Sequence, residues 1–201
     1  MNKILITGAA GFIGLKLAEN LISNKNKLFL VDNLSRGKFD NSFKKILKNK
    51  NVKFLKKDLT KKLSFKDKFD YIFHLASVVG VKNVNQDPIK TFNNNILSTL
   101  NLIQSIKNKK ETKLVFFSTS EVYAASSKRN KIFKPSEEKS DLLILKDVKP
   151  RDSYFLSKLI CEKVVSLSGC KFIILRPHNI YGPLVFFSTS EVYAASSKRN
   201  K

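Results

Sequence analysis

Three side chains, Tyr154, Lys158 and Thr119, carry the most distinctive chemistry in this sequence. Tyr154 and Lys158 are four residues apart in a segment with helical spacing, which places both on one face of the helix. A nearby ammonium stabilises a phenolate, so we expect it to lower the pKa of Tyr154 from about 10 toward the range of a general base. Thr119 follows a predicted strand, where its hydroxyl can share the proton of a substrate alcohol with Tyr154. An exposed tyrosine beside a lysine is the alternative for the pair alone, but the three groups together indicate oxidation of an alcohol by hydride transfer to a nicotinamide.

A glycine-rich turn supplies the second candidate site, between the first predicted strand and the first predicted helix. It reads Thr7-Gly8-Ala9-Ala10-Gly11-Phe12-Ile13-Gly14. Gly8 and Gly11 allow a tight turn and close approach of the backbone to a pyrophosphate, and Gly14 lets the helix pack against the sheet. Free N–H groups at the helix N-terminus attract the anion. Asp32 ends the second strand, where a carboxylate accepts from ribose hydroxyls and repels a 2′-phosphate. The pattern predicts NAD rather than NADP, against the alternative of an ordinary turn after a strand.

Alternating strands and helices must position these residues. We predict strands over 3–7, 28–31, 52–55, 71–75, 113–118 and 171–175, and helices over 12–23, 38–48, after Pro88 and over 153–167, with a polar loop over 126–150. This alternation predicts an α/β fold in which helices cover both faces of a parallel sheet. Sites in such folds form at the carboxyl ends of the strands, where Asp32 and Thr119 lie.

Composition limits the class of protein. The chain has 201 residues, of which 42% are hydrophobic and 27% charged, as expected for one globular domain. It contains no apolar run of the roughly 18 residues that a membrane span needs, and its start lacks the features of a signal peptide. Cys161 and Cys170 have no metal-type or CxxC spacing, so we expect buried, reduced thiols in a cytoplasmic protein without a metal.

The formal charge of +22 raises the alternative of nucleic-acid binding. Only five of the 38 basic residues are arginine, and the lysines are spread along the chain, often beside asparagine. Nucleic-acid readers favour clustered arginine interleaved with aromatic residues, so we attribute the charge to solvated faces.

Residues 114–131 recur letter for letter as residues 184–201. Structural repeats diverge except at packing positions, so this identity indicates a duplication, a recombination or an assembly error in the gene rather than a repeat fold. Residues 1–183 carry the independent information. We expect the copied segment 184–188 to form an added edge strand or to remain exposed.

The motifs occur in the order found in a known family. They are Thr7 to Gly14, Val31-Asp32-Asn33-Leu34-Ser35-Arg36-Gly37, Asp58-Leu59, His74-Leu75-Ala76, Asn95, Ser118-Thr119-Ser120-Glu121-Val122-Tyr123, Tyr154-x-x-x-Lys158 and Arg176-Pro177-x-Asn179-x-Tyr181-Gly182-Pro183. On these motifs the chain resembles the extended short-chain dehydrogenase/reductase family, the NAD-dependent nucleotide-sugar epimerases and dehydratases.

The resemblance implies a Rossmann-type, doubly wound sheet over residues 1–183, with the smaller substrate domain of the family largely missing and 184–201 not a domain. It also implies a homodimer. The cofactor-binding residues that it implies are Gly8, Gly11, Phe12, Ile13, Gly14, Asp32, Asn33, Asp58, Leu59, Leu75, Ala76, Tyr154 and Lys158. Asp58 and Leu59 are expected at the adenine, the backbone after His74 along the cofactor, and Lys158 on the nicotinamide ribose. Ser120 and Asn179 are expected near the nucleotide sugar.

The sequence has two histidines that could serve in catalysis by residue type, but their context favours other roles. His74 ends a buried strand, so we expect a packed, hydrogen-bonded core side chain. For His178, an approach to substrate is the less favoured of its two interpretations.

The triplet Thr119-Ser120-Glu121 indicates the reaction type. The 4,6-dehydratases of the family carry Thr-Asp-Glu, in which the Asp protonates the departing hydroxyl, and Ser120 is too weak an acid for that role near neutral pH. The triplet resembles that of the UDP-glucuronate decarboxylases, with an epimerase as the next possibility. Both reactions pass through a 4-keto sugar, with Tyr154 as base, Lys158 tuning it, Thr119 as its partner and Glu121 assisting.

Family members continue beyond Pro183 into further strands and the substrate domain, so we expect this chain to bind NAD weakly or partly and to turn over little. The alternative outside catalysis is a dinucleotide-binding module, or a basic protein that binds nucleic acid on the same fold.

Overall fold

A computed structural model describes residues 1–37, 39–123, 141–144, 146–180 and 194–196 of the chain. The end of the last motif, Tyr181-Gly182-Pro183, and the copied segment 184–188 lie outside the described residues, as does most of the predicted loop over 126–150. Over the described ranges, no helix is both long and apolar enough to cross a bilayer.

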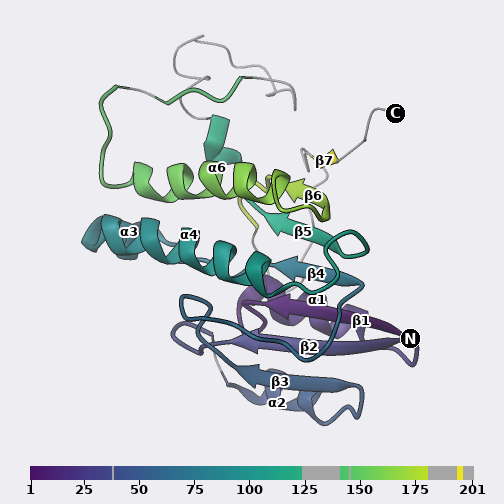
Figure 1. The fold of residues 1–201 in the computed structure, drawn as a ribbon. Helices are drawn as coiled ribbons and strands as arrows, with labels where there is room; N and C mark the ends of the chain where they lie inside the picture. The colour runs from purple at the N-terminus through teal and green to yellow at the C-terminus, as the bar shows by residue number, and fades with distance from the viewer. Residues whose placement is uncertain (38, 124–140, 145, 181–193, 197–201) are drawn as a thin grey trace.

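The sheet is the frame on which the candidate site is built (Figure 1). Its strands are β1 (Asn2–Thr7), β2 (Asn26–Asp32), β3 (Val52–Lys56), β4 (Tyr71–His74), β5 (Lys113–Phe117), β6 (Lys171–Leu175) and β7 (Ala194–Ser196). They lie in the order β3-β2-β1-β4-β5-β6-β7, and every neighbouring pair is parallel except β6 with β7. The strand order reverses direction between β1 and β4, which is where doubly wound folds bind their ligands.

Helices cover both faces of the sheet (Figure 1). They are α1 (Phe12–Leu21), α2 (Asn41–Leu47), α3 (Val81–Gln86), α4 (Pro88–Ser105), the short 3₁₀ helix η1 (Ser120–Tyr123) and α6 (Asp152–Ser166). The side chains of β1 alternate between two cores: Leu5 packs in the core that includes residues of α4 and α6, whereas Ile4 and Ile6 pack in the core that includes residues of α1 and α2. This alternation confirms the predicted parallel α/β sheet with helices on both faces.

Strand register brings the functional ends together. Thr7 at the end of β1 is paired with Val31 of β2 and with His74 of β4, and His74 is paired with Phe116 of β5. The segments that follow β1, β2, β4 and β5 therefore leave the same edge of the sheet.

The structure differs from the sequence prediction at several helices. Helix α2 begins at Asn41 rather than residue 38, because the carboxylate of Asp40 caps it by accepting from the N–H of Phe43 at 2.9 Å. Helices α3 and η1 were not predicted, since each is too short to show a periodic pattern.

The copied tail contributes one described strand. β7 pairs antiparallel with the outer edge of β6, through Leu175 opposite Ala194. This edge strand covers Ala194–Ser196; the copied segment 184–188 lies outside the described residues, so the expectation for it stays a prediction.

Candidate functional site

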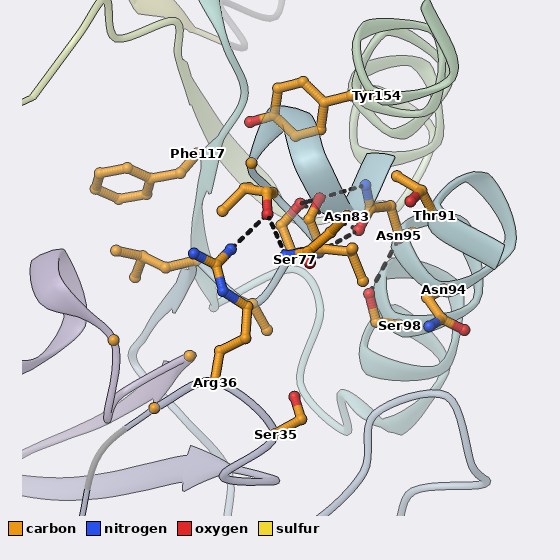
Figure 2. Close-up of a pocket in the computed structure, with 18 of the residues that line it drawn as sticks. Ser35, Arg36, Ser77, Asn83, Thr91, Asn94, Asn95, Ser98, Phe117 and Tyr154 are labelled. Atoms are coloured by element: carbon orange, nitrogen blue, oxygen red, sulfur yellow. Dashed lines mark hydrogen bonds between the residues drawn. The ribbon is translucent and has the colours of Figure 1, made fainter. Parts of the chain in front are cut away.

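A large cleft crosses the carboxyl edge of the sheet, with a volume of about 1400 Å³. Pockets for a single small ligand measure roughly 300–1,000 Å³, so this cleft has room for a dinucleotide and a further ligand. Figure 2 shows Arg36 and Ser35 on one side and the Tyr154 ring opposite, with Ser77 and Asn95 between them. The side chain of Arg36 crosses toward the segment after β4, where its Nη1 donates to the carbonyl of Val79 at 2.6 Å.

Glycines shape the end of the cleft beside β1. Gly8 has φ +69°, and a Cβ there would lie 2.8 Å from the backbone nitrogen of Ala76. A Cβ on Gly14 would lie 2.2 Å from the carbonyl oxygen of Gly8, so this glycine packs α1 against the turn itself rather than against the sheet. Gly11 is the N-cap of α1 and supplies no side-chain cap. The N–H groups in the first turn of a helix have no intrahelical acceptor, and here no N-cap side chain accepts from them either. Phe12 and Ile13 of this turn line the cleft.

Asp32 lines the same end of the cleft, and its carboxylate is already held by backbone donors. One oxygen accepts from the N–H of Ala10 at 3.0 Å and the other from the N–H of Leu34 at 2.7 Å. Each oxygen keeps a second lone pair, so the group can still accept from a ribose. The other expected cofactor residues that line the cleft are Asn33, Asp58, Leu59, Leu75 and Ala76.

Tyr154, Thr119 and Lys158 meet at the other end. The Thr119 side chain interacts with the Tyr154 phenol and lowers its pKa. Lys158 is only 3% exposed, its Nζ donates to the carbonyl of Phe117 at 2.7 Å, and it lies 4.9 Å from the ring centre of Phe116. Burial lowers the pKa of Lys158 to about 8, because the charged form loses its hydration.

The predicted fall in the pKa of Tyr154 is wrong for this structure. Burial, followed by the negative charge of Glu121, raises the pKa of Tyr154 to about 12, and the hydrogen bond with Thr119 opposes that rise. Lys158 directs its ammonium to a backbone carbonyl of β5 instead of to the phenol.

The three residues of the Thr-Ser-Glu triplet do not all face the cleft. Thr119 and Glu121 line the cleft, and Glu121 lies 3.8 Å from Nη2 of Arg151, which also lines it. Ser120 does not line the cleft, and its N–H donates to the carbonyl of Pro177. Asn179 and His178 both lie on the cleft wall.

His74 is a core residue, as predicted. It is 1% exposed, with Nδ1 2.7 Å from the Thr7 hydroxyl and Nε2 3.0 Å from the Thr99 hydroxyl. Burial, and next the charge of Lys158, lower the pKa of His74 to about 3, so it remains neutral. The Thr7 hydroxyl also accepts from the N–H of Ala76, which ties the segment after β4 to β1.

Sequence reasoning missed the groups that support this site. Asn95 accepts from the N–H of Val78 at 2.7 Å and donates to the Ser157 hydroxyl at 3.0 Å, joining the cleft wall to α6. Glu162 and Arg176 form a buried ion pair at 2.7 Å. Asn95 and Arg176 were visible only as members of family motifs, and no local pattern singled out Glu162.

Comparison with known proteins gives consistent matches. The model of the NAD dependent epimerase/dehydratase family matches residues 4–201. A dTDP-D-glucose 4,6-dehydratase of Dictyostelium discoideum is 36% identical over 200 residues, covering 91% of this chain and 45% of the relative. A UDP-N-acetyl-alpha-D-glucosaminuronate decarboxylase of Bacillus cytotoxicus is 35% identical over 188 residues, covering 90% and 55%.

Solved structures agree with these relatives. The Bordetella bronchiseptica enzyme WbmF, solved in complex with NAD+ and UDP, superimposes with a TM-score of 0.70 at 25% identity, covering 90% of this chain and 51% of that one. The chain thus spans about half the length of the proteins that it matches.

Proposed function

The chain belongs to the NAD dependent epimerase/dehydratase family, and from this premise we propose that its cleft binds NAD and serves the oxidation of a nucleotide-sugar hydroxyl to a ketone. One observation carries the proposal: a single cleft joins the glycine turn and Asp32 at one end to Thr119, Tyr154 and Lys158 at the other. A dinucleotide site and an alcohol-oxidising site therefore share one continuous space.

The residues present fit the cofactor. Gly11 caps α1 without a side chain and the first residues of α1 line the cleft, so the N–H groups of the first turn are available to a pyrophosphate. In this proposal Asp32 binds the adenosine ribose and Lys158 the nicotinamide ribose, and both residues line the cleft. NAD, when bound, accepts the hydride from the sugar carbon and later returns it.

Tyr154 takes the hydroxyl proton in this proposal, and Thr119 orients the hydroxyl that is oxidised. With a pKa of about 12, Tyr154 is protonated at neutral pH, so its ionisation needs additional positive charge nearby. Arg151 contributes by pairing with Glu121, because this reduces the negative charge that the phenol meets. Lys158 is the cation on the helix face of Tyr154.

We favour an acidic sugar, decarboxylated after oxidation at C4. The C4 ketone makes a β-keto acid of the C5 carboxylate. The C5–carboxyl bond breaks and carbon dioxide leaves, the electron pair forms the C4–C5 double bond of an enolate, and C5 takes a proton from solvent to restore the ketone. The returned hydride at C4, with a proton on the oxygen, then gives the pentose. Ser120 offers no acid for the departing hydroxyl that a dehydration requires. Arg151 on the cleft wall offers a cation to a substrate carboxylate.

An epimerase is the second candidate, because the same oxidation and a returned hydride on the opposite face would invert C4. A purified chain incubated with NAD+ and UDP-glucuronate distinguishes the two. A UDP-pentose with released carbon dioxide supports decarboxylation, whereas a UDP-hexuronate epimer supports the alternative. Failure to bind NADH in a fluorescence titration would refute the common proposal. Salt-sensitive binding of RNA or DNA without competition from NADH would favour the non-catalytic alternative.

We also propose a homodimer, formed through the outer faces of α4 and α6. These faces expose Ile89, Leu97 and Ile160, large apolar side chains of the kind that subunit interfaces cover. Sedimentation equilibrium of the chain and of an Ile89→Lys/Leu97→Lys variant tests the proposal, which requires the variant to be monomeric and the parent chain dimeric.

A further inference from the structure

A buried polar cluster lies behind the candidate site, at the junction of β5, β6 and α6. Glu162 of α6 is its centre: one carboxylate oxygen accepts from the Ser118 hydroxyl at 2.5 Å and from Nε of Arg176 at 2.9 Å, and the other accepts from Nη2 of Arg176 at 2.7 Å. Nη1 of Arg176 donates to the hydroxyl of Tyr123 in η1. All four side chains are buried, so each depends on the others for its hydrogen bonds.

Glu162 is placed on the same helix face as the chemical groups. It follows Lys158 by four residues and Tyr154 by eight, so the three side chains lie in line along α6. Lys158 donates to the carbonyl of Phe117, the last residue of β5, and Glu162 accepts from Ser118, which directly follows the strand. Side chains from two successive turns of α6 are therefore hydrogen-bonded to the two residues that precede Thr119.

We propose that Glu162 is a positioning residue of the candidate site: through Ser118 and Arg176 it fixes the end of β5 against α6, and so sets Thr119 opposite Tyr154. The cluster also connects the end of β5 to β6. Ser118 is bound through its N–H to the carbonyl of Leu175 in β6, and Arg176 follows directly along the chain. The inference rests on the proposed function only in what Thr119 and Tyr154 do.

Glu162 also acts on Lys158 through its charge. Burial lowers the pKa of Lys158, and the charges of Cys161 and Glu162 raise it again. The titratable groups that face Lys158 in the described chain are these two on its own helix and His74 on β4, with Arg176 paired behind Glu162. Removing the charge of Glu162 therefore makes Lys158 lose its proton at lower pH.

Two variants separate positioning from general support of the fold. Ser118→Ala removes only the contact with the end of β5 and leaves the Glu162–Arg176 pair intact. Glu162→Gln/Arg176→Gln removes both charges and avoids leaving a buried cation unpaired. Glu19→Gln is the matched control, because it breaks a partly exposed helical ion pair with Lys16 on α1.

The Ser118→Ala variant is tested by amide hydrogen exchange. We expect the amides of Ser120 and Glu121 to exchange about tenfold faster than in the parent chain, as follows from losing one hydrogen bond to a charged group. Amides of Leu5 and Leu30 in the central strands should keep their rates, which a general loss of stability would not allow.

The double variant is tested by the dissociation constant of NADH from pH 6 to 9. We expect its loss of affinity on raising the pH to begin at lower pH than in the parent chain and in Glu19→Gln, because Glu162 acts directly on the pKa of Lys158 whereas Arg176 lies paired behind Glu162. Coincident profiles from a folded double variant, or unchanged Ser120 and Glu121 exchange in Ser118→Ala, overturn the inference. If the parent chain binds no NADH, the proposed function fails, and the exchange experiment alone then decides the role of Glu162, as it does if the double variant does not fold.

Discussion

The buried ammonium of Lys158 should lower the free energy of unfolding near neutral pH, and replacing Lys158 should remove a rise of that free energy with pH. Its pKa falls from 10.5 to about 8 on burial. The folded state therefore loses this proton near pH 8, whereas the unfolded state keeps it until about pH 10.5. Between these values the unfolded state binds more protons, so the free energy of unfolding rises with pH.

The magnitude follows from the two pKa values. Below pH 8 the buried ammonium costs about 3 kcal/mol relative to the unfolded chain. Between pH 7 and 9.5, Lys158 alone should raise the free energy of unfolding by about 2 kcal/mol. Lys158→Met should lack this rise. The raised thiol pKa values of Cys161 and Cys170 act in the opposite direction, but both proteins carry them, so they largely cancel in the comparison.

Urea unfolding of the parent chain and Lys158→Met at pH 7, 8, 8.5, 9 and 9.5 measures the effect, with Lys110→Met as a control at an exposed lysine. The stability difference between parent and Lys158→Met should move by about 2 kcal/mol in favour of the parent across this range, and Lys110→Met should follow the parent. A difference that stays constant with pH would refute the assignment of a desolvated, charged Lys158.

Three further predictions concern the frame around the site. Gly14→Ala should lose NADH binding and more than about 2 kcal/mol of stability in urea unfolding, because its Cβ would lie 2.2 Å from the Gly8 carbonyl oxygen; a variant as stable as the parent would contradict the packing. The pKa of His74 is about 3 in the folded chain and 6.5 in the unfolded chain, so the unfolded state binds a proton that the folded state does not as the pH falls from 6.5 to 4.5. The free energy of unfolding should therefore drop by about 2 kcal/mol over this range. Urea unfolding at both pH values should show no such drop for His74→Gln. Deleting 184–201 should leave NADH affinity unchanged and solubility equal or better, because β7 is a three-residue edge strand; markedly lower solubility would show that the tail packs.

The repeating parts of the structure could be predicted because they depend on local pattern. Apolar runs ending at Thr7, Asp32 and His74 gave the strands, and their order along the chain gave a parallel sheet. The glycine turn was found because its spacing reflects backbone contacts within a few residues. Gly14 shows the limit of that reasoning, since its contact is with Gly8 and not with the sheet.

The site chemistry was harder because it depends on side chains that meet across long stretches of sequence. Glu162 meets Ser118, 44 residues away, and no periodicity in α6 indicates which side chain faces it. The direction of the Tyr154 pKa shift depends on burial and on the distance to Glu121, which helical spacing does not contain. Spacing showed that Tyr154 and Lys158 share a face, but not that Lys158 turns to the carbonyl of Phe117.

The two hydrogen bonds that Asp32 accepts from the backbone would limit how easily the proposed cofactor preference could change during evolution. Its carboxylate holds Ala10 in the glycine turn and Leu34, a residue with φ 61°, in the segment after β2. A substitution that admitted a 2′-phosphate would at once release the glycine turn, which in the proposed site holds the pyrophosphate, and Leu34 with its positive φ. In the proposed site the residue that selects the cofactor also holds both backbone segments, so a change of preference would require compensating substitutions in each of them.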